Sequence, residues 1–320
     1  MGMKKGLLAI GLSMVAAHVF GQMPVAGVHY PAGLNGSKAG IPAAPGIYFQ
    51  DDNWIFTANA NQSASVSTFT LVYVQAPQLT WLTDWKVLGA NVGADVMVPL
   101  IYREDSKSFH LNLPSSNRLT VTMASDRFGV GDIKIEPLLL AWHWEQCDLM
   151  TAYAVWAPSG HFSAGSLDNL GDNEWTHMIS LGAVWYPDEE KTWAVSILHH
   201  YEINSSQVGP AYGGVAPGGG YELVEYRKIA CSTYTLECAV SKTIFDHTDV
   251  GLTAYYQQQF SADSSAANPN ANSDVAGVGP EISALIPGWN LLASLRYAYE
   301  FTAYDRPQGH TVDLSLTKKF

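Results

Sequence analysis

Histidine and serine are the residue types in this chain that could carry catalysis. A serine hydrolase needs a serine, a histidine and an orienting polar group on one face of the fold. Adjacent His199 and His200 point to opposite faces of a strand, and the odd spacing of Ser315 and Lys318 separates those two residues in the same way. No Gly-x-Ser-x-Gly elbow, P-loop or Rossmann glycine pattern occurs. We therefore predict no catalytic site, no metal site and no cofactor. The histidines left for a hydrolase site are His143, His161, His177 and His199.

The charge balance argues against nucleic acid as a partner. The 320 residues include 17 Lys and Arg against 29 Asp and Glu, for a formal net charge of −12. Binding to a phosphate backbone requires a basic face, and the sequence has no basic cluster. Only 14% of the residues are charged, whereas 12% are aromatic and 28 are glycine. This composition suits strands and turns better than a helical enzyme.

The first residues have the pattern of a cleaved secretory signal peptide. Lys4 and Lys5 form the positive region, residues 6–20 the apolar region, and Gly21 is the small residue before cleavage. The apolar region is shorter than the roughly 20 residues that a membrane-spanning helix needs. We therefore expect a signal peptide at 1–21, a Gly- and Pro-rich segment at 22–46 and a strand-rich region at 47–320.

From Gly46 onward, apolar and polar residues alternate with the period of a strand. Most of the expected strands are as long as the roughly 9 to 11 residues that cross a bilayer, and longer than strands of soluble sheets. Short turns alternate with long polar loops at 101–130, 158–173, 203–223 and 261–274, as in outer-membrane barrels. Twelve strands are expected, within a range of 10 to 14, at 47–60, 65–75, 88–100, 131–144, 148–157, 174–186, 191–202, 224–241, 249–260, 275–286, 289–302 and 310–320.

Two connections break this alternation. Residues 61–64 are short where a long loop is due, and residues 76–87 are long where a turn is due. Leu79, Leu82 and Val87 beside two tryptophans could form a short amphipathic helix or an extra strand, and we prefer the helix.

The strands predict an all-β, antiparallel transmembrane barrel in the outer membrane of a Gram-negative bacterium. A sheet in lipid must close, because an open edge would leave backbone groups without partners. The last strand resembles the signal by which the barrel-assembly machinery inserts such proteins, although Lys318 stands where that signal has an apolar residue. Its residues are Val312, Leu314, Leu316 and Phe320.

The polar row of each strand predicts the residues that line the lumen, where eight acids and two bases would favour cations or neutral solutes, or would form salt bridges that hold the wall. They are Asp95, Lys134, Glu136, Glu202, Glu237, Asp249, Gln257, Gln259, Glu281, Arg296, Glu300 and Asp313.

Aromatic residues on the alternate rows predict two girdles at the membrane interfaces, with His177 and His199 on the same lipid-facing rows. The aromatics are Trp175, Trp185, Trp193, Tyr201, Tyr297 and Tyr299.

Several segments resemble the outer-membrane transporters named for the meta-cleavage pathway of phenol degradation. The likeness runs from about Gly27 to Phe320. It is carried by 27–33 (GVHYPAG), 39–49 (AGIPAAPGIYF), 131–138 (GDIKIEPL), 157–160 (APSG), 191–193 (KTW), 201–204 (YEIN) and 278–281 (VGPE). Ser159 stands where the family often has Thr. The resemblance implies a barrel that admits aromatic or other hydrophobic compounds, and it supplies no catalytic residue.

We therefore expect a channel for passive uptake of small hydrophobic or aromatic compounds, embedded in outer-membrane lipid. Twelve strands lie between the roughly eight that side chains can fill and the sixteen that leave an open pore, so a narrow or plugged lumen is expected. Segment 22–46 could lie in the lumen as a plug or in the periplasm. The alternatives are a structural or adhesive barrel that acts through its external loops, and an outer-membrane hydrolase.

Overall fold

The computed structural model describes residues 28–38, 44–63, 66–112, 118–163, 166, 168–205, 207–215, 221–228, 231–261, 273–304 and 306–320. The expected signal peptide, residues 1–21, lies outside the described residues. No helix in these ranges is both long enough and apolar enough to cross a membrane.

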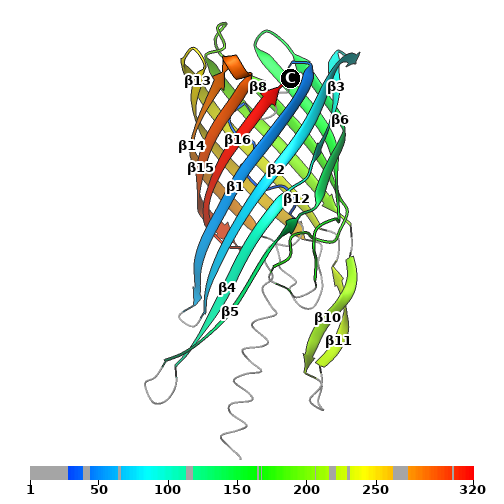
Figure 1. The fold of residues 1–320 in the computed structure, drawn as a ribbon, viewed down its shortest axis with the longest axis vertical. Helices are drawn as coiled ribbons and strands as arrows, with labels where there is room; N and C mark the ends of the chain where they lie inside the picture. Colours follow the sequence, from blue (N-terminus) through cyan, green and yellow to red (C-terminus); the bar gives the residue numbers. More distant parts are fainter. Residues whose placement is uncertain are drawn as a thin grey trace, which may run out of the picture.

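The chain forms one closed, antiparallel β-barrel (Figure 1). Its strands are β1 (Gly46–Ser63), β2 (Val66–Val87), β3 (Ala90–Met97), β4 (Leu100–Asn112), β5 (Arg118–Val130), β6 (Ile133–His143), β7 (Cys147–Ala157), β8 (Thr176–Trp185), β9 (Trp193–Asn204), β10 (Gln207–Val215), β11 (Tyr221–Lys228), β12 (Cys231–Phe245), β13 (Thr248–Ser261), β14 (Asp274–Ile286), β15 (Leu291–Tyr304) and β16 (Gly309–Lys319). A single 3-10 turn at Pro287–Trp289 joins β14 to β15 among the residues described.

Twelve spans make up the wall in the described part of the chain, because two spans are each divided into two strands. β3 and β4 form one of these spans, and β5 and β6 form the other. β2 pairs with β3 near one rim and with β4 farther along, and β3 and β4 pair in turn with β6 and β5. β1 pairs with both β2 and β16, which closes the ring. β10 and β11 pair only with each other and form a hairpin outside the wall. The prediction of a twelve-strand barrel is confirmed.

The divided spans break beside a proline. Pro99 has no N–H to donate to the ladder, so strand pairing stops between β3 and β4. The neighbouring groups still bond across the break: Val98 N–H donates to Pro77 O at 3.1 Å, and Gly131 N–H donates to Pro99 O at 2.8 Å. The wall therefore bends at this level without opening its backbone hydrogen bonding.

Side chains alternate between a buried row and an exposed row along each span. On β8, Thr176, Met178 and Ser180 are 0 to 2% exposed, whereas Ile179 and Leu181 are 45% and 54% exposed. The buried rows carry most of the charged side chains, and the exposed rows are mainly apolar. This arrangement is the reverse of a water-soluble protein and fits a wall whose outer surface meets lipid.

The helix expected over 76–87 is wrong, because these residues continue β2 to Val87. Leu79 and Trp81 face outward, whereas Leu82 is buried inside, which is the period of two. The ladder with β3 shifts register between Leu82 and Lys86, and this irregularity breaks the period that a sequence reading needs. Leu88 and Gly89, both with positive φ (53° and 83°), close the hairpin as a two-residue turn.

Two expected loops also contain strands. Residues 101–130 hold β4 and β5, which pair over Leu100–Asn112 and extend past the barrel rim in Figure 1. Residues 203–223 hold β10 and the start of β11. In the sequence, four consecutive polar residues at 103–106 and the Gly- and Pro-rich run at 209–214 interrupt the alternation by which strands were recognised. Every long connection, after β7, β9 and β13, lies at one rim, whereas Gly46 and Lys319 lie at the other, the short-turn rim, which is periplasmic in such barrels. The two-residue connection between β1 and β2 remains short at the rim of the long connections.

Candidate functional site: the barrel lumen and the segment that crosses it

Residues Val28–Lys38, which we call the lumen segment, lie inside the barrel and contact side chains from opposite walls. The segment has no regular secondary structure, so its backbone groups need partners from the wall. Inward-facing carboxylates and one arginine supply many of them. Three groups of contacts fix the segment.

The first group holds His29. Its ring Nε2 lies 2.9 Å from Asp132 Oδ2, and its Nδ1 lies 3.8 Å from Asp172 Oδ2. The backbone N–H groups of His29 and Tyr30 both donate to Glu202 Oε1 at 3.2 Å. Asp132 also accepts the N–H groups of Gly160 and Asp172, each at 2.8 Å. Asp132 lies between β5 and β6, so it joins their span and the loop after β7 to the lumen segment.

The second group holds Tyr30 and Gly33. The Tyr30 hydroxyl donates to Glu237 Oε1 at 2.8 Å, and the same oxygen accepts the Gly33 N–H at 2.7 Å. Gly33 has φ of 81°, a conformation that favours glycine, and a Cβ there would lie 2.7 Å from the Tyr255 ring. Gln257 Nε2 donates to Tyr30 O at 3.0 Å.

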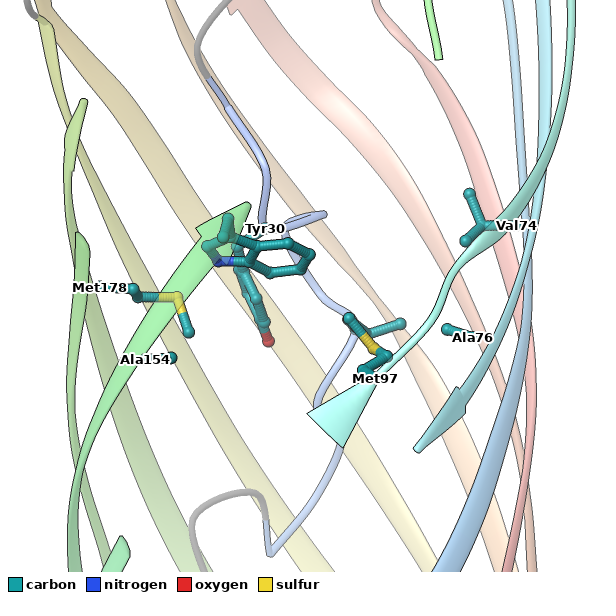
Figure 2. Close-up of a cluster of buried hydrophobic side chains, with 8 residues drawn as sticks. Tyr30, Val74, Ala76, Met97, Ala154 and Met178 are labelled. Carbon is teal, nitrogen blue, oxygen red and sulfur yellow. The ribbon is translucent and has the colours of Figure 1, made fainter. Parts of the chain in front are cut away.

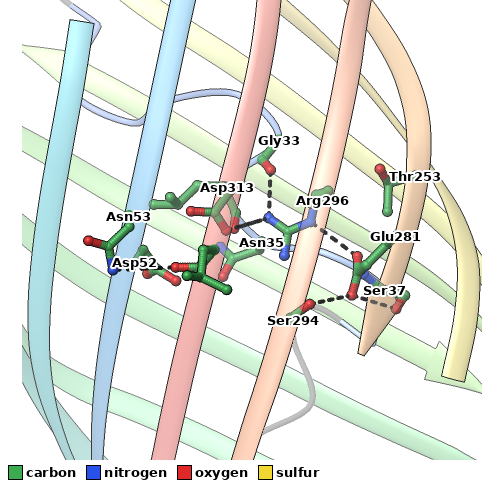
Figure 3. A network of polar contacts seen from close by, with 12 residues as sticks. Gly33, Asn35, Ser37, Asp52, Asn53, Thr253, Glu281, Ser294, Arg296 and Asp313 are labelled. Atoms are coloured by element: carbon green, nitrogen blue, oxygen red, sulfur yellow. Dashed lines mark hydrogen bonds and ion pairs between the residues drawn. The ribbon is translucent and has the colours of Figure 1, made fainter. Parts of the chain in front are cut away.

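The third group is centred on Arg296 (Figure 3). Its guanidinium pairs with Glu281 at 3.1 Å and Asp313 at 3.3 Å, and it donates to the carbonyl groups of Gly33 and Leu34 at 2.9 and 2.5 Å. Glu281 accepts the Ser37 N–H at 2.7 Å and the Ser37 hydroxyl at 2.9 Å. Because Arg296 bonds two acids and two backbone carbonyl groups at once, it holds both the acids and the segment.

The twelve residues predicted to line the lumen all stand on strands of the wall. Eleven are buried, and Asp249 is half-buried, where it accepts a 2.6 Å ion pair from Lys38. Lys134 pairs with Asp95 at 3.1 Å and Glu136 at 3.6 Å, away from the Arg296 group. Six of the twelve bond directly to the lumen segment: Glu202, Glu237, Asp249, Gln257, Glu281 and Arg296.

An apolar cluster packs on the other side of the lumen segment. Figure 2 shows Tyr30 on the coil inside the barrel, with Met178 and Ala154 to one side and Met97 to the other. Leu34 and Trp156 belong to the same buried cluster. These apolar side chains face the lumen, which the rule of polar side chains inside did not predict.

Two cavities lie on either side of this cluster. The larger, about 560 Å³, is bordered by Tyr48, Asn290 and Lys319 near the short-turn rim, and we call it the periplasmic cavity. The smaller, about 190 Å³, is bordered by Ile101, Phe162 and Leu170 toward the long loops, and we call it the external cavity. Leu34, Met97 and Trp156 line both cavities. We call these three residues the apolar septum.

The segments that carry the family resemblance meet at these contacts. His29 belongs to GVHYPAG, Asp132 to GDIKIEPL, Gly160 to APSG, Glu202 to YEIN and Glu281 to VGPE. The first four are joined by the hydrogen bonds around Asp132 and Glu202. The sequence analysis assigned no role to His29, Tyr30 or Asp132, although their occurrence in these motifs was a signal that could have identified them.

The residues predicted for the membrane interfaces are all exposed. Trp175, Trp185, Trp193, Tyr201, Tyr297 and Tyr299 are 40 to 55% exposed. His177 lies on the outer face with its Nδ1 2.7 Å from the Tyr153 hydroxyl, and His199 bonds Tyr234 at 2.6 Å. These histidines therefore complete outer-surface aromatic pairs.

The last strand pairs with the first along most of its length. Val312 and Leu314 face outward, and Phe320 N–H donates to Ile47 O at 3.0 Å. Leu316 pairs with Asp51 across the closing seam. Lys318 donates to Trp289 O at 2.9 Å, so its charged end bonds at the rim.

A closed antiparallel barrel with an apolar exterior and a polar, acid-rich lumen defines the chain as an outer-membrane β-barrel. The chain belongs to the family described as "Putative MetA-pathway of phenol degradation", which matches residues 55–316. The resemblance found in the sequence is thereby confirmed.

Solved structures agree on the fold. An outer membrane channel from Pseudomonas putida F1 is similar with a TM-score of 0.62 and 10% identity, covering 92% of this chain and 100% of that chain. The beta domain of a Bordetella autotransporter is similar with a TM-score of 0.50 and 12% identity, covering 87% and 100%. At these identities the likeness concerns the fold alone. No curated protein matches the chain.

Proposed function

We propose that this protein is an outer-membrane channel for passive uptake of small hydrophobic or aromatic compounds. The observation that carries the proposal is the pair of cavities on either side of the lumen segment, separated by an apolar septum of three side chains. A path through Leu34, Met97 and Trp156 would desolvate a solute between two wider chambers, which disfavours ions and favours apolar solutes. The family description and the Pseudomonas channel support the same function.

The chain divides into three parts in this proposal. Residues 1–21 are a signal peptide, residues 22–46 a plug segment, and residues 47–320 the barrel. The lumen segment is the longer described part of the plug, and its contacts with Glu237, Glu281 and Arg296 support a role in narrowing the pore rather than a place in the periplasm.

Single-channel recording in planar bilayers, with and without phenol, tests the proposal. We expect discrete, small conductance steps that phenol interrupts as it occupies the septum. A structural or adhesive barrel with a filled lumen would conduct nothing, and phenol would have no effect. That result would overturn the channel function and favour a role for the projecting β4–β5 and β10–β11 hairpins.

The hydrolase alternative has one observation in its favour. Ser180 Oγ lies 2.8 Å from His200 Nδ1 in the lumen. A catalytic triad also needs an orienting group on the second ring nitrogen of the histidine. Within the described ranges, His200 Nε2 has no hydrogen-bonding partner. The pair therefore lacks that third group, and we prefer the channel.

The barrel-assembly machinery is the partner that we propose for the last strand. Deleting Phe320 should reduce assembly of the barrel in the outer membrane without changing the fold of the molecules that do assemble, because its aromatic side chain is 72% exposed and adds little packing. Surface levels measured by protease accessibility in whole cells check this. Normal levels of the truncated protein would contradict it.

A further inference from the structure

Two buried polar atoms on the apolar side of the lumen have no partner within the described residues: His200 Nε2 and Trp156 Nε1. The two side chains are 4% and 3% exposed, and both line the periplasmic cavity. An unpaired buried polar group costs about 1 to 3 kcal/mol, so such atoms are expected to meet a ligand or water.

The surroundings of His200 hold its ring in place. Ser180 Oγ bonds Nδ1 at 2.8 Å, and the Tyr30 ring packs on the imidazole with centroids 4.0 Å apart. Nε2 is therefore the ring nitrogen left for a ligand. Nε2 is a donor when the Ser180 hydroxyl donates to Nδ1, and an acceptor when the Nδ1–H donates to the Ser180 hydroxyl.

The indole of Trp156 is fixed in a similar way. It belongs to the buried cluster of Met178, Met97 and Leu34, and its ring lies 5.5 Å from the His29 ring. Its N–H is a donor only. The cavity beside these two groups is also lined by Leu139, Met150 and Leu198, which offer an apolar surface to a flat molecule.

The charges around the cavity exclude an anion. Its lining holds three carboxylates, Asp52, Asp95 and Glu136, against the two amines of Lys134 and Lys319. Lys134 is already paired with Asp95 and Glu136. A carboxylate ligand would meet a surplus of negative charge here, whereas a neutral hydroxyl would not.

We propose that the periplasmic cavity is a binding site for a small, uncharged aromatic molecule with a hydroxyl group, held by His200 Nε2 and Trp156 Nε1. A hydroxyl both donates and accepts, so it can satisfy the indole N–H and either form of the imidazole. A cavity of about 560 Å³ lies within the roughly 300 to 1,000 Å³ typical of small-molecule sites. The inference rests on the proposed function, because the ligand would be the permeant resting beyond the septum.

Equilibrium binding to the purified full-length protein in nanodiscs tests the site without requiring transport. Fluorine NMR would compare para-fluorophenol, para-fluorotoluene and para-fluorobenzoate, with partition into empty nanodiscs subtracted. We expect para-fluorophenol to bind more tightly than the toluene analogue, and para-fluorobenzoate to bind weakest.

The variants separate hydrogen bonding from packing. Trp156→Phe and His200→Leu should each weaken para-fluorophenol binding about 2- to 10-fold, the effect of one lost hydrogen bond, and should leave para-fluorotoluene binding unchanged or stronger. His200→Gln, which keeps a donor and an acceptor, should restore part of the loss. Trp185→Phe is the matched control, because Trp185 lies on the outer face of β8 and is 55% exposed.

Equal binding of the phenol and toluene analogues to the unaltered protein would overturn the site and leave water as the partner of these atoms. Loss of phenol binding in Trp185→Phe as large as in Trp156→Phe would also overturn it. Phenol binding without any conductance would refute the channel but keep the site. Conductance that phenol interrupts, without saturable binding in the nanodiscs, would refute the site but keep the channel.

Discussion

The two sides of the lumen treat the lumen segment differently. On the side of β12 to β15, Glu237, Glu281 and Arg296 hold its backbone with directional hydrogen bonds. On the side of β3, β7 and β8, the segment meets mainly Met97, Trp156 and Met178 through apolar contact. We call these the polar wall and the apolar wall. Directional bonds fix a position, whereas apolar side chains can change rotamer at little cost.

This difference assigns separate tasks to the walls. The polar wall keeps the segment in the lumen, and the apolar wall supplies the surface past which a solute can move. The exceptions on the apolar side are Glu202, which accepts the N–H groups of His29 and Tyr30 at 3.2 Å, and Asp132, which lies 2.9 Å from His29 Nε2. Both hold the start of the segment, whereas the Leu34 side chain in the septum meets apolar neighbours and its backbone carbonyl bonds Arg296 on the polar wall.

Replacing Arg296 with Leu should have the largest effect. Arg296 is 6% exposed, and its removal leaves Glu281 and Asp313 as buried carboxylates without their cation while freeing the Gly33 and Leu34 carbonyl groups. Breaking a buried pair costs about 3 to 5 kcal/mol. We expect a lower melting temperature and a several-fold larger conductance as the segment loosens, measured by thermal unfolding in detergent and by bilayer recording.

Lys242→Leu is the control for the charge change in Arg296→Leu. Lys242 is exposed and lies over the Trp193 ring at 4.9 Å. It should lower stability only slightly and leave the conductance unchanged. Unaltered currents from a well-folded Arg296→Leu barrel would show that the polar wall does not hold the segment.

Gly36→Val should release the segment without removing any charge. A Cβ at Gly36 would lie 2.1 Å from Glu281 Oε2 and 2.3 Å from Arg296, so the segment must shift away from the polar wall. We expect a larger conductance with a smaller loss of stability than in Arg296→Leu, because Arg296 keeps its acids. Gly288→Val is the matched control, since a Cβ at Gly288 meets nothing within 4 Å. Equal conductance in the two valine variants would contradict this prediction.

Met178→Ala should alter the apolar wall alone. Met178 is 2% exposed and packs in the cluster beside the septum, so truncation should destabilise the barrel by about 2 to 5 kcal/mol and widen the path. We expect faster passage of bulkier aromatic solutes, measured in proteoliposomes, with unchanged ion preference. Leu181→Ala on the outer face of the same strand, 54% exposed, is the control and should change neither. A changed ion preference in Met178→Ala would show that the two walls do not act separately.

The barrel could be predicted from the sequence because the period of two is a local property. Arg296 and Glu300 alternate with outward Tyr297 and Tyr299 within one strand, so their row follows from spacing alone. The register shifts of β2 and the polar hairpin of β4 and β5 interrupt that period, and there the expectations failed.

The septum could not be predicted in this way. Met97 and Trp156 of the septum, and Met178 beside them, are apolar residues on inward rows, which reverses the rule used to separate lumen from lipid. Their neighbours in the lumen segment are far away in the sequence: the Tyr30 hydroxyl bonds Glu237, which is 207 residues along the chain. Contacts of this kind depend on closure of the whole ring and leave no local pattern.

The smallest effect is expected where neither wall is involved, at the periplasmic turn between β8 and β9. The Asp188 carboxylate accepts bonds from the Thr192 hydroxyl at 2.6 Å, the Trp193 N–H at 2.8 Å and the Thr192 N–H at 2.8 Å, and these bonds lower its pKa. A folded-state pKa below the unfolded one adds stability above the unfolded pKa, and this stability is lost as the pH falls through the folded pKa. Asp188→Ala should therefore melt slightly below the unaltered protein at neutral pH, and the difference should shrink as the solution is acidified. Its conductance and phenol response should equal those of the unaltered barrel, because the turn contacts neither the lumen segment nor the septum. A changed phenol response in Asp188→Ala would mean that the periplasmic rim also controls the path, and that the polar and apolar walls do not account for it alone.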